Sequence, residues 1–139
     1  MGRILAIDFG RKRCGLAVTD PLKMIANGLD TIPSHTIWEF LEDYQKKETL
    51  DIIVVGYPKN LDNTPSESII YINPFIKKLK QKYPEIVIEL MDERFTSKMA
   101  FQAMIDGGLK KKDRQDKALV DKISAVIILQ SYLDYNKTN

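Results

Sequence analysis

Residues 3–20 decide the fold of this chain, and they read Arg3-Ile4-Leu5-Ala6-Ile7-Asp8-Phe9-Gly10-Arg11-Lys12-Arg13-Cys14-Gly15-Leu16-Ala17-Val18-Thr19-Asp20. The continuous apolar run at residues 4–7 is typical of a strand that is covered on both faces. A tight basic turn follows, and residues 14–18 predict a second strand. Because the connection is so short, the two strands must pair in antiparallel orientation.

Further along the chain, strands alternate with helices. Residues 24–32 are a weaker candidate for a strand, whereas residues 51–56 and 85–91 are stronger ones. Helices are predicted from residue 36, from residue 64 to residue 83, from residue 96 to residue 106 and from residue 114 to residue 135. This alternation implies parallel pairing. We therefore expect one α/β domain over residues 1–139, with a five-stranded mixed sheet and helices on both faces.

Local signals predict where the helices begin and which faces they bury. Thr36 with Glu39, and Thr64 with Glu67, match the capping box, in which the two side chains bond to each other's backbone N–H groups. Pro74 lies inside the second predicted helix and should kink or divide it. In the last helix, the spacing predicts a core stripe of Leu119, Ile123, Val126, Ile127, Gln130 and Leu133.

Composition limits the chemistry that the chain can perform. Of its 139 residues, 44% are hydrophobic and 29% are charged, which is typical of a globular protein. The single Cys14 excludes a disulfide framework and a cysteine zinc site, and the single His35 excludes a histidine-rich one. No apolar run approaches the roughly 20 residues that cross a bilayer. We expect a cytoplasmic protein that has no membrane partner and whose metal chemistry, if any, uses carboxylates.

Acidic residues end two of the predicted strands. Asp8 ends the first strand, and Asp92 and Glu93 end the last one, at the edge where ligands bind in α/β sheets. If the first and last parallel strands are neighbours, Asp8 and Glu93 converge. Adjacent strand residues face opposite ways, so that only one of Asp92 and Glu93 points inward. We favour Glu93, and the sequence leaves Asp92 open.

A further acid, Asp121, lies in the first two turns of the last predicted helix. It shares a face with Ser124 and Ala125, whose small size would let the helix approach the sheet and direct this carboxylate toward Asp8. Converging carboxylates repel unless a cation neutralises them, and Mg²⁺ and Mn²⁺ prefer oxygen ligands. Two such ions about 4 Å apart promote phosphodiester hydrolysis. Each acid also has a structural interpretation, since Asp8 could accept N–H groups of its turn and Asp121 could favour a helix N-terminus.

Basic residues form two groups, which are Arg11, Lys12 and Arg13 in the first turn, and Lys110, Lys111, Lys112 and Arg114 before the last helix. Solvated loops are one interpretation of such charge runs. A surface that faces nucleic-acid phosphates is the other, and it gains weight if the acids lie between the two groups in space. Arg13 and Arg94 are candidates for contacting the phosphates beside a cleaved bond. Asp20 and residues 57–60 are candidates for lining the same site.

Residues 8–20 and three later blocks, in the same order, resemble a known family. The later blocks are Val55-Gly56-Tyr57-Pro58-Lys59-Asn60, Asp92-Glu93-Arg94-Phe95-Thr96-Ser97 and Val120-Asp121-Lys122-Ile123-Ser124-Ala125. Together they are similar to the YqgF/RuvX family of Holliday junction resolvases and pre-16S rRNA nucleases, over nearly the whole chain. Asn63 replaces a glycine that is common in the family, and asparagine also tolerates a positive φ.

The resemblance implies an RNase H-like fold and a metal-dependent endonuclease, a hydrolase that acts on ester bonds of structured nucleic acid. It implies Mg²⁺ or Mn²⁺ held by Asp8, Glu93 and Asp121, with Asp8 bridging two ions. The implied task is processing of the 5′ end of precursor 16S rRNA in ribosome biogenesis, and the alternative is resolution of branched DNA at Holliday junctions. The choice between RNA and DNA, the preferred cleavage sequence, and the choice between a monomer and a weak homodimer stay open. Two rivals of other classes are an ATP-binding protein and a non-catalytic RNA-binding module.

Overall fold

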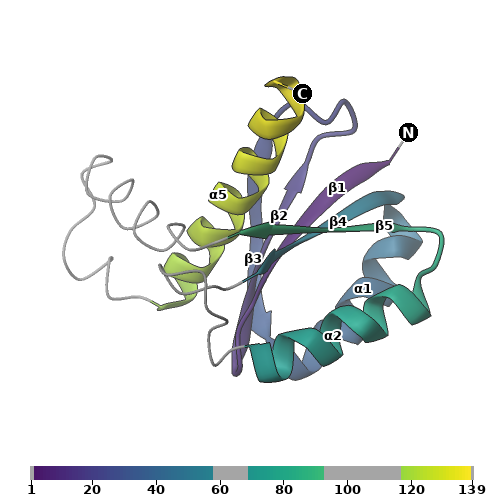
Figure 1. Cartoon of the computed structure of the whole chain (residues 1–139), viewed down its shortest axis with the longest axis vertical. Helices are drawn as coiled ribbons and strands as arrows, with labels where there is room; N and C mark the ends of the chain where they lie inside the picture. Colours follow the sequence, from purple (N-terminus) through teal and green to yellow (C-terminus); the bar gives the residue numbers. More distant parts are fainter. Residues whose placement is uncertain (1, 58–68, 93–116, 139) are drawn as a thin grey trace.

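The computed structural model describes residues 2–57, 69–92 and 117–138, and within them the chain forms a five-stranded sheet (Figure 1). The strand order is β3-β2-β1-β4-β5. The first three strands are antiparallel, whereas β1, β4 and β5 run parallel. The predicted mixed sheet is therefore confirmed. Its strands are β1 (Arg3–Phe9), β2 (Arg13–Thr19), β3 (Ala26–Pro33), β4 (Leu50–Tyr57) and β5 (Val87–Asp92).

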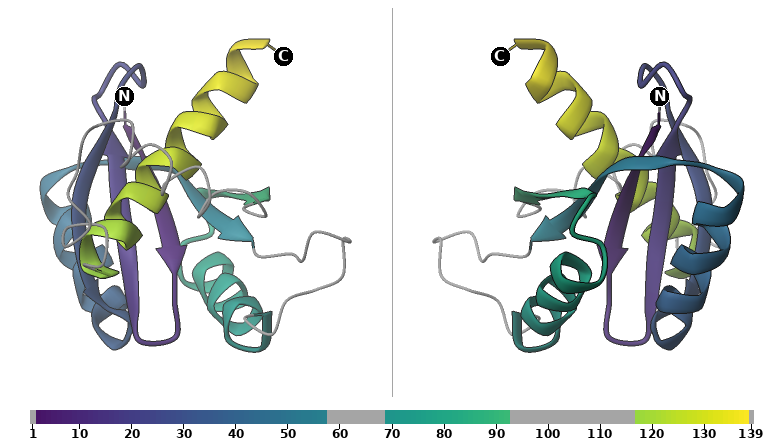
Figure 2. Two further views of the ribbon diagram at one scale, coloured as in Figure 1. Left: turned by 90° about the vertical axis from the view of Figure 1, so that its left-hand side faces the viewer. Right: turned by 90° about the vertical axis from the view of Figure 1, so that its right-hand side faces the viewer.

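Helices cover both faces of the sheet, as predicted (Figure 2). A short 3-10 turn, η1 (Ser34–Thr36), leads into α1 (Ile37–Lys47), which shares one face with α2 (Ile69–Lys82). The long C-terminal helix α5 (Lys117–Thr138) crosses the other face over β1, β2 and β3. Within the described ranges, no helix is long and apolar enough to span a bilayer.

Two local predictions about helices are wrong. Thr36 does not close a capping box, because its hydroxyl donates a hydrogen bond to the carbonyl of Pro33 (2.7 Å) within the 3-10 turn. Pro74 lies inside α2, which continues to Lys82, so the predicted division of this helix is wrong, whereas the predicted kink stays a prediction. The second capping box at Thr64, and the helix predicted over residues 96–106, lie outside the described residues.

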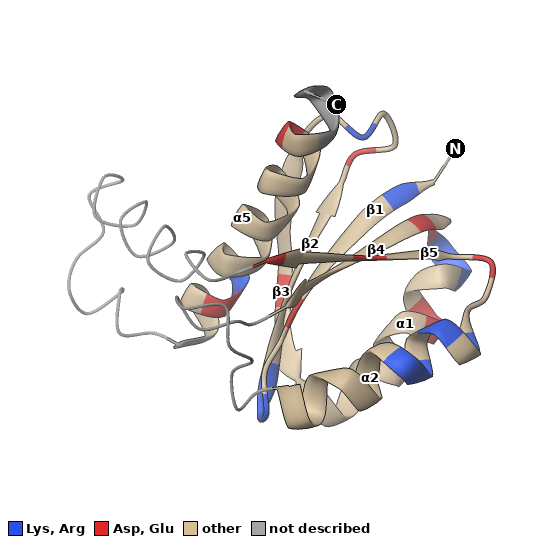
Figure 3. Ribbon diagram, in the orientation of Figure 1, with Lys and Arg blue, Asp and Glu red and all other residues tan. Residues whose placement is uncertain are grey.

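The turn between β1 and β2 carries basic residues at one end of the sheet (Figure 3). The Gly10 N–H donates to the carbonyl of Arg13 (3.0 Å), which closes the turn. Ser34 reinforces it from η1, because its hydroxyl donates to the Gly10 carbonyl (2.6 Å) and its N–H donates to the Lys12 carbonyl (2.9 Å). The exposed side chains of Arg11 and Lys12 are therefore held on a well-anchored backbone.

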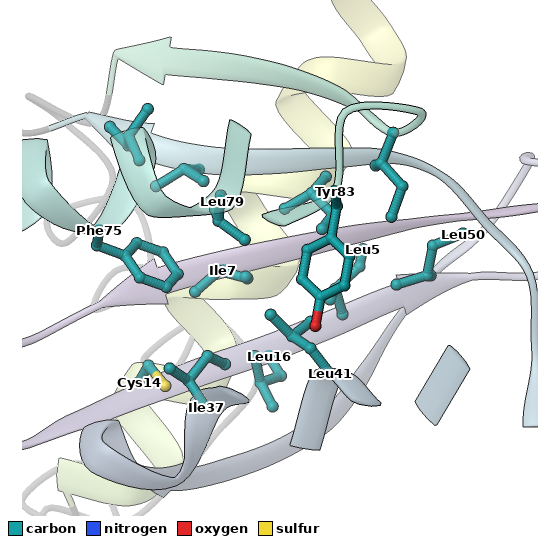
Figure 4. Close-up of a cluster of buried hydrophobic side chains, with 14 of the residues drawn as sticks. Leu5, Ile7, Cys14, Leu16, Ile37, Leu41, Leu50, Phe75, Leu79 and Tyr83 are labelled. Carbon is teal, nitrogen blue, oxygen red and sulfur yellow. The ribbon is translucent and has the colours of Figure 1, made fainter. Parts of the chain in front are cut away.

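The face covered by α1 and α2 is filled by large apolar side chains (Figure 4). Burial of this many branched and aromatic groups supplies most of the hydrophobic stabilisation that a domain of this size needs. Phe9, at the end of β1, stacks on Phe75 of α2 with ring centroids 4.1 Å apart. The fully or nearly fully buried residues of this cluster include Leu5, Ile7, Leu16, Ile37, Leu41, Ile53, Ile72 and Leu79.

The face covered by α5 is lined by smaller residues. Ala6 and Ala17 of the sheet and Ala125 of the helix are fully buried there, together with Ile128 and Leu129. The core stripe predicted for this helix is mostly wrong, because the helix is rotated so that Ser124, Ala125, Ile128, Leu129, Tyr132 and Leu133 face the sheet. Of the predicted stripe, Leu133 is buried, Val126 packs partly against the core and Gln130 is exposed, because the small residues of the sheet accept the neighbouring face that begins with Ser124 and Ala125.

Candidate active site

Asp8 lies on the face of the sheet that α5 covers. Strand residues alternate between the two faces, and in β1 the residues Ile4 and Ala6 belong to the α5 side whereas Leu5 and Ile7 belong to the α1 side. Asp8 follows in the same alternation, and its side chain is half-buried near the end of the strand. Its carboxylate therefore faces the N-terminal part of α5 and not the large hydrophobic core.

Gly15 is the point where α5 touches the sheet next to Asp8. In the antiparallel pairing of β1 and β2, Gly15 is the partner of Asp8. A Cβ atom at Gly15 would overlap the backbone carbonyl of Asp121, so only glycine permits this approach. Ser124 and Ala125, on the same face of the helix, are buried. The close approach predicted from these two small residues is confirmed, and it brings Asp8 and Asp121 to the same side of the sheet.

Sequence reasoning assigned no role to Gly15, although a signal for it was present. Glycine weakens a strand interior, so a glycine in the apolar run at residues 14–18 indicates that another backbone comes close. The approaching segment could not be named from the sequence, because it lies more than a hundred residues further along the chain.

Asp121 is paired with a basic residue of the first turn region. Arg13, the first residue of β2, donates from Nε to Oδ2 of Asp121 at 2.5 Å. The two side chains retain 35% and 25% of their exposure, so solvent still reaches the pair. They line a depression of about 330 Å³ together with Gly10, Arg11 and Lys12. The predicted basic group of the first turn therefore lies beside one of the predicted acids.

Cys14 reports on the charge of this region from the other face of the sheet. Burial raises the pKa of its thiol to about 12, a hydrogen bond with Ser34 opposes the rise, and the negative charges of Asp8 and Asp121 add to it. The thiol is therefore protonated at neutral pH and acts as a small apolar group, not as a nucleophile. Both carboxylates lie close enough to influence one buried group.

The acids of β5 need a correction. β4 lies between β1 and β5, so the first and last parallel strands are not neighbours and stand roughly 10 Å apart. Met91 belongs to the α5 side, and Asp92, paired with Tyr57, therefore faces the opposite side from Asp8 and is exposed. Between the two strands, Gly56 of β4 pairs with Met91 and contributes no side chain. Glu93 lies outside the described residues.

Asp20 does not line this site. It follows β2, which is antiparallel to β1, so Asp20 lies at the opposite end of the sheet from Asp8, roughly 16 Å away along the strands. Its carboxylate accepts the backbone N–H groups of Leu22, Met24 and Ile25 at 2.8–3.1 Å. These hydrogen bonds, that of Ile25 first, lower the pKa of Asp20. Its role is to shape the loop between β2 and β3.

The other predicted phosphate contacts divide into two sets. Arg11 and Lys12 are exposed on the anchored turn beside the depression, where a nucleic-acid backbone could reach them. Outside the described residues lie Arg94, Lys110, Lys111, Lys112, Arg114 and residues 58–60 of the second loop.

The donor set of the site suits a hard divalent cation. Asp8 and Asp121 offer carboxylate oxygens on one side of the sheet, and the guanidinium of Arg13 already places positive charge against Asp121. Among the described residues, no group of three or more acids, histidines or cysteines is close enough to form a metal site on its own.

Comparison with known proteins identifies the family of this chain. The family model of RuvX, described as a Holliday junction resolvase, matches residues 2–135. A protein of Phocaeicola vulgatus is 58% identical over 137 residues, which cover 99% of both chains. Proteins of Christiangramia forsetii (59% over 133 residues, 96% of this chain and 98% of the relative) and Porphyromonas gingivalis (58% over 134 residues, 96% and 97%) are similarly close. All three bear the name "Putative pre-16S rRNA nuclease". The chain belongs to the RuvX family, and its mixed α/β sheet is the RNase H-like fold of that family.

Proposed function

We propose that this protein is a Mg²⁺- or Mn²⁺-dependent endonuclease that hydrolyses phosphodiester bonds of structured nucleic acid, and that its substrate is the 5′ region of precursor 16S rRNA. The observation that carries the proposal is the approach of α5 to β2 at Gly15, beside Asp8, which gathers two carboxylates next to an anchored basic turn. The names of the close relatives and the description of the RuvX family support a nucleic-acid substrate.

In this proposal, Asp8 and Asp121 are metal ligands and Glu93 is the third. Asp8, on the central strand β1 between β2 and β4, would hold the ions in the middle of the site. Support for Glu93 over Asp92 comes from the alternation along β5, since Asp92 belongs to the face opposite Asp8. Gly56 leaves the intervening strand without a side chain on the α5 side, which favours a shared site across β4.

The protein's own residues bind and orient the nucleic acid. When bound, divalent ions would activate a water molecule and stabilise the leaving oxygen of the phosphodiester. Arg11 and Lys12 are assigned to the phosphate backbone beside the scissile bond, because they are exposed at the rim of the depression that Asp121 lines. Arg94 keeps its assignment beside the scissile bond, and more distant phosphates are assigned to Lys110, Lys111, Lys112 and Arg114. The protein is expected to act in the cytoplasm as a monomer or weak homodimer.

A second candidate substrate is branched DNA, which the description of the RuvX family favours. RNA and DNA junctions present the same phosphodiester group to the same acids, so the site alone does not separate them. The discriminating experiment gives purified protein both substrates side by side, a labelled precursor of the 16S 5′ end and a labelled four-way DNA junction, with Mg²⁺, with Mn²⁺ and without metal. We expect metal-dependent cleavage of the precursor RNA at a defined position.

Matched acid variants test the site in the same assay. Asp8→Asn and Glu93→Gln should abolish cleavage, whereas Asp92→Asn, on the face opposite Asp8, should retain it. Cleavage that survives Asp8→Asn would contradict the proposal. Nucleic-acid binding that is indifferent to metal and to Asp8→Asn, without cleavage, would favour a non-catalytic RNA-binding module. Saturable ATP binding without cleavage would favour the ATP-binding alternative.

A further inference from the structure

We infer that Arg13 is a positioning residue that holds the Asp121 carboxylate in the metal-free protein and releases it when a divalent ion binds. The inference rests on the proposed function, because it assumes that Asp121 is a metal ligand. It adds a role for a residue of this chain in controlling how readily the site accepts a metal.

First, Arg13 already occupies one carboxylate oxygen of Asp121. Nε of Arg13 lies 2.5 Å from Oδ2 of Asp121, one of the two carboxylate oxygens that this residue could offer to a metal ion. An oxygen that accepts so short a charge-assisted hydrogen bond has lost much of its capacity for a second cation. Arg13 and a divalent ion therefore compete for Asp121.

The second step concerns how easily the pair can separate. Arg13 and Asp121 keep about a third and a quarter of their exposure. Ion pairs that solvent reaches contribute little free energy, so a doubly charged ion with several oxygen ligands can replace the guanidinium. At the same time, the backbone contact between Gly15 and Asp121 keeps the helix in place without this ion pair. The exchange needs a side-chain movement and no rearrangement of the fold.

The third step concerns where the released guanidinium goes. Arg13 lines the same depression as Arg11 and Lys12, and it begins β2 directly after their turn. A guanidinium that leaves Asp121 is therefore already beside the two exposed cations that are assigned to phosphate. Arginine binds phosphate in a two-pronged geometry, so the nucleic acid itself would draw Arg13 away from Asp121. Metal binding and nucleic-acid binding then strengthen each other by the same factor.

The test measures metal binding without nucleic acid and without turnover. Mn²⁺ is titrated into wild type, Arg13→Gln and Arg13→Lys, and free Mn²⁺ is read from its electron paramagnetic resonance signal. The matched control is Lys122→Gln, which removes one positive charge from the residue next to Asp121. The side chain of Lys122 lies over Gly28 of β3. We expect Arg13→Gln to bind Mn²⁺ about fivefold more tightly than wild type, and clearly more tightly than Lys122→Gln, because the competing ion pair is gone.

Arg13→Lys should fall between wild type and Arg13→Gln, since an ammonium still competes for Asp121 but lacks the planar fork. It also serves as the comparison if thermal melting shows that Arg13→Gln is not folded. If folded Arg13→Gln binds Mn²⁺ no more tightly than Lys122→Gln, the inference is overturned and Arg13 is a fixed support of Asp121. If Arg13→Gln does not fold, an Arg13→Lys affinity no tighter than that of wild type overturns it.

The two hypotheses fail in different ways. If wild type binds Mn²⁺ and both Asp8→Asn and Asp121→Asn weaken that binding, the metal site stands, and an unchanged affinity in the Arg13 variants overturns only the exchange. If wild type binds no Mn²⁺, or if neither acid variant changes the affinity, the metal site is overturned and the exchange with it.

Discussion

The two faces of the sheet are built on different principles. On the α1 and α2 face, large branched and aromatic side chains such as Leu5, Leu41 and Phe75 fill the space between helix and strand. On the α5 face, Ala6 and Ala17 let the helix come close. The first face secures stability through buried apolar area, whereas the second holds a helix backbone at a set place relative to one strand.

The difference matters because of what each face carries at the end of the sheet. A helix that rests on large side chains can shift as those side chains change rotamer or are exchanged for others of similar volume. A helix whose backbone touches Gly15 cannot move inward, and the acid at the contact, Asp121, is placed with the same accuracy as the backbone. Adjacent residues of β2 illustrate both principles, since Cys14 faces the large core and Gly15 faces the helix.

The largest effect is expected from Gly15→Val, which breaks the close approach itself. Its side chain would overlap the Asp121 carbonyl and push α5 away, at a cost of at least about 3 kcal/mol in the free energy of unfolding. Urea unfolding measures that loss, and cleavage at a temperature where the variant is folded measures the displacement of Asp121. Cys14→Ala, one residue away on the other face, is the control and should keep its cleavage activity. A folded, fully active Gly15→Val protein would contradict the role of the contact.

A smaller effect, on stability alone, is expected from Leu41→Ala on the face of the sheet covered by α1 and α2. Leu41 is fully buried, and its truncation leaves a cavity that destabilises the protein by about 2–3 kcal/mol. The folded fraction should cleave at the wild-type rate, because the helix that carries Asp121 lies on the other side of the sheet. Denaturant midpoints and single-turnover rates, measured on the same preparation, separate the two quantities. A large loss of rate in the folded fraction would mean that the faces are not independent.

The buried thiol of Cys14 predicts that the free energy of unfolding falls by about 1 kcal/mol between pH 8 and pH 10. The pKa of Cys14 is raised to about 12 in the folded protein, so the folded state keeps the thiol protonated while the unfolded state ionises near pH 9. This stabilising contribution is complete below pH 9 and is lost as the pH rises toward 12, by up to about 1.4 kcal/mol per pH unit. The difference in unfolding free energy between wild type and Cys14→Ala, followed from pH 8 to pH 10, measures it. A difference that does not change with pH would contradict it.

The smallest effect on stability, below about 1 kcal/mol, is expected from Asp121→Asn in the absence of metal. Repulsion between acids alone would make this substitution stabilising, whereas loss of the partly exposed ion pair with Arg13 makes it slightly destabilising. Thermal melting in a chelating buffer measures the sign. In Arg13→Gln, which has already lost the pair, the same substitution should become neutral or stabilising. A higher melting temperature for the single variant Asp121→Asn would show that repulsion dominates.

Much of the architecture could be predicted because it depends on local patterns. The apolar runs of β1 and β4 and the short basic turn were sufficient for the strand–turn–strand unit and the mixed sheet. Predictions failed where a competing interaction lay outside the motif or stripe considered. Thr36 bonds to Pro33, which precedes the predicted capping box, and α5 is rotated so that the face beginning with Ser124 and Ala125 packs on the sheet.

The amino-acid sequence alone determined that carboxylates stand at the ends of predicted strands and that basic residues stand in the turn between the first two. That Asp92 and Glu93 face opposite ways stays a prediction from strand alternation, because Glu93 lies outside the described residues. Only the folded molecule decided that β4 separates β1 from β5, that Asp20 belongs to the far end of the sheet, and that Asp121 pairs with Arg13. The physical reason is that chain-distant neighbours depend on strand order and helix rotation, and packing over the whole domain sets both.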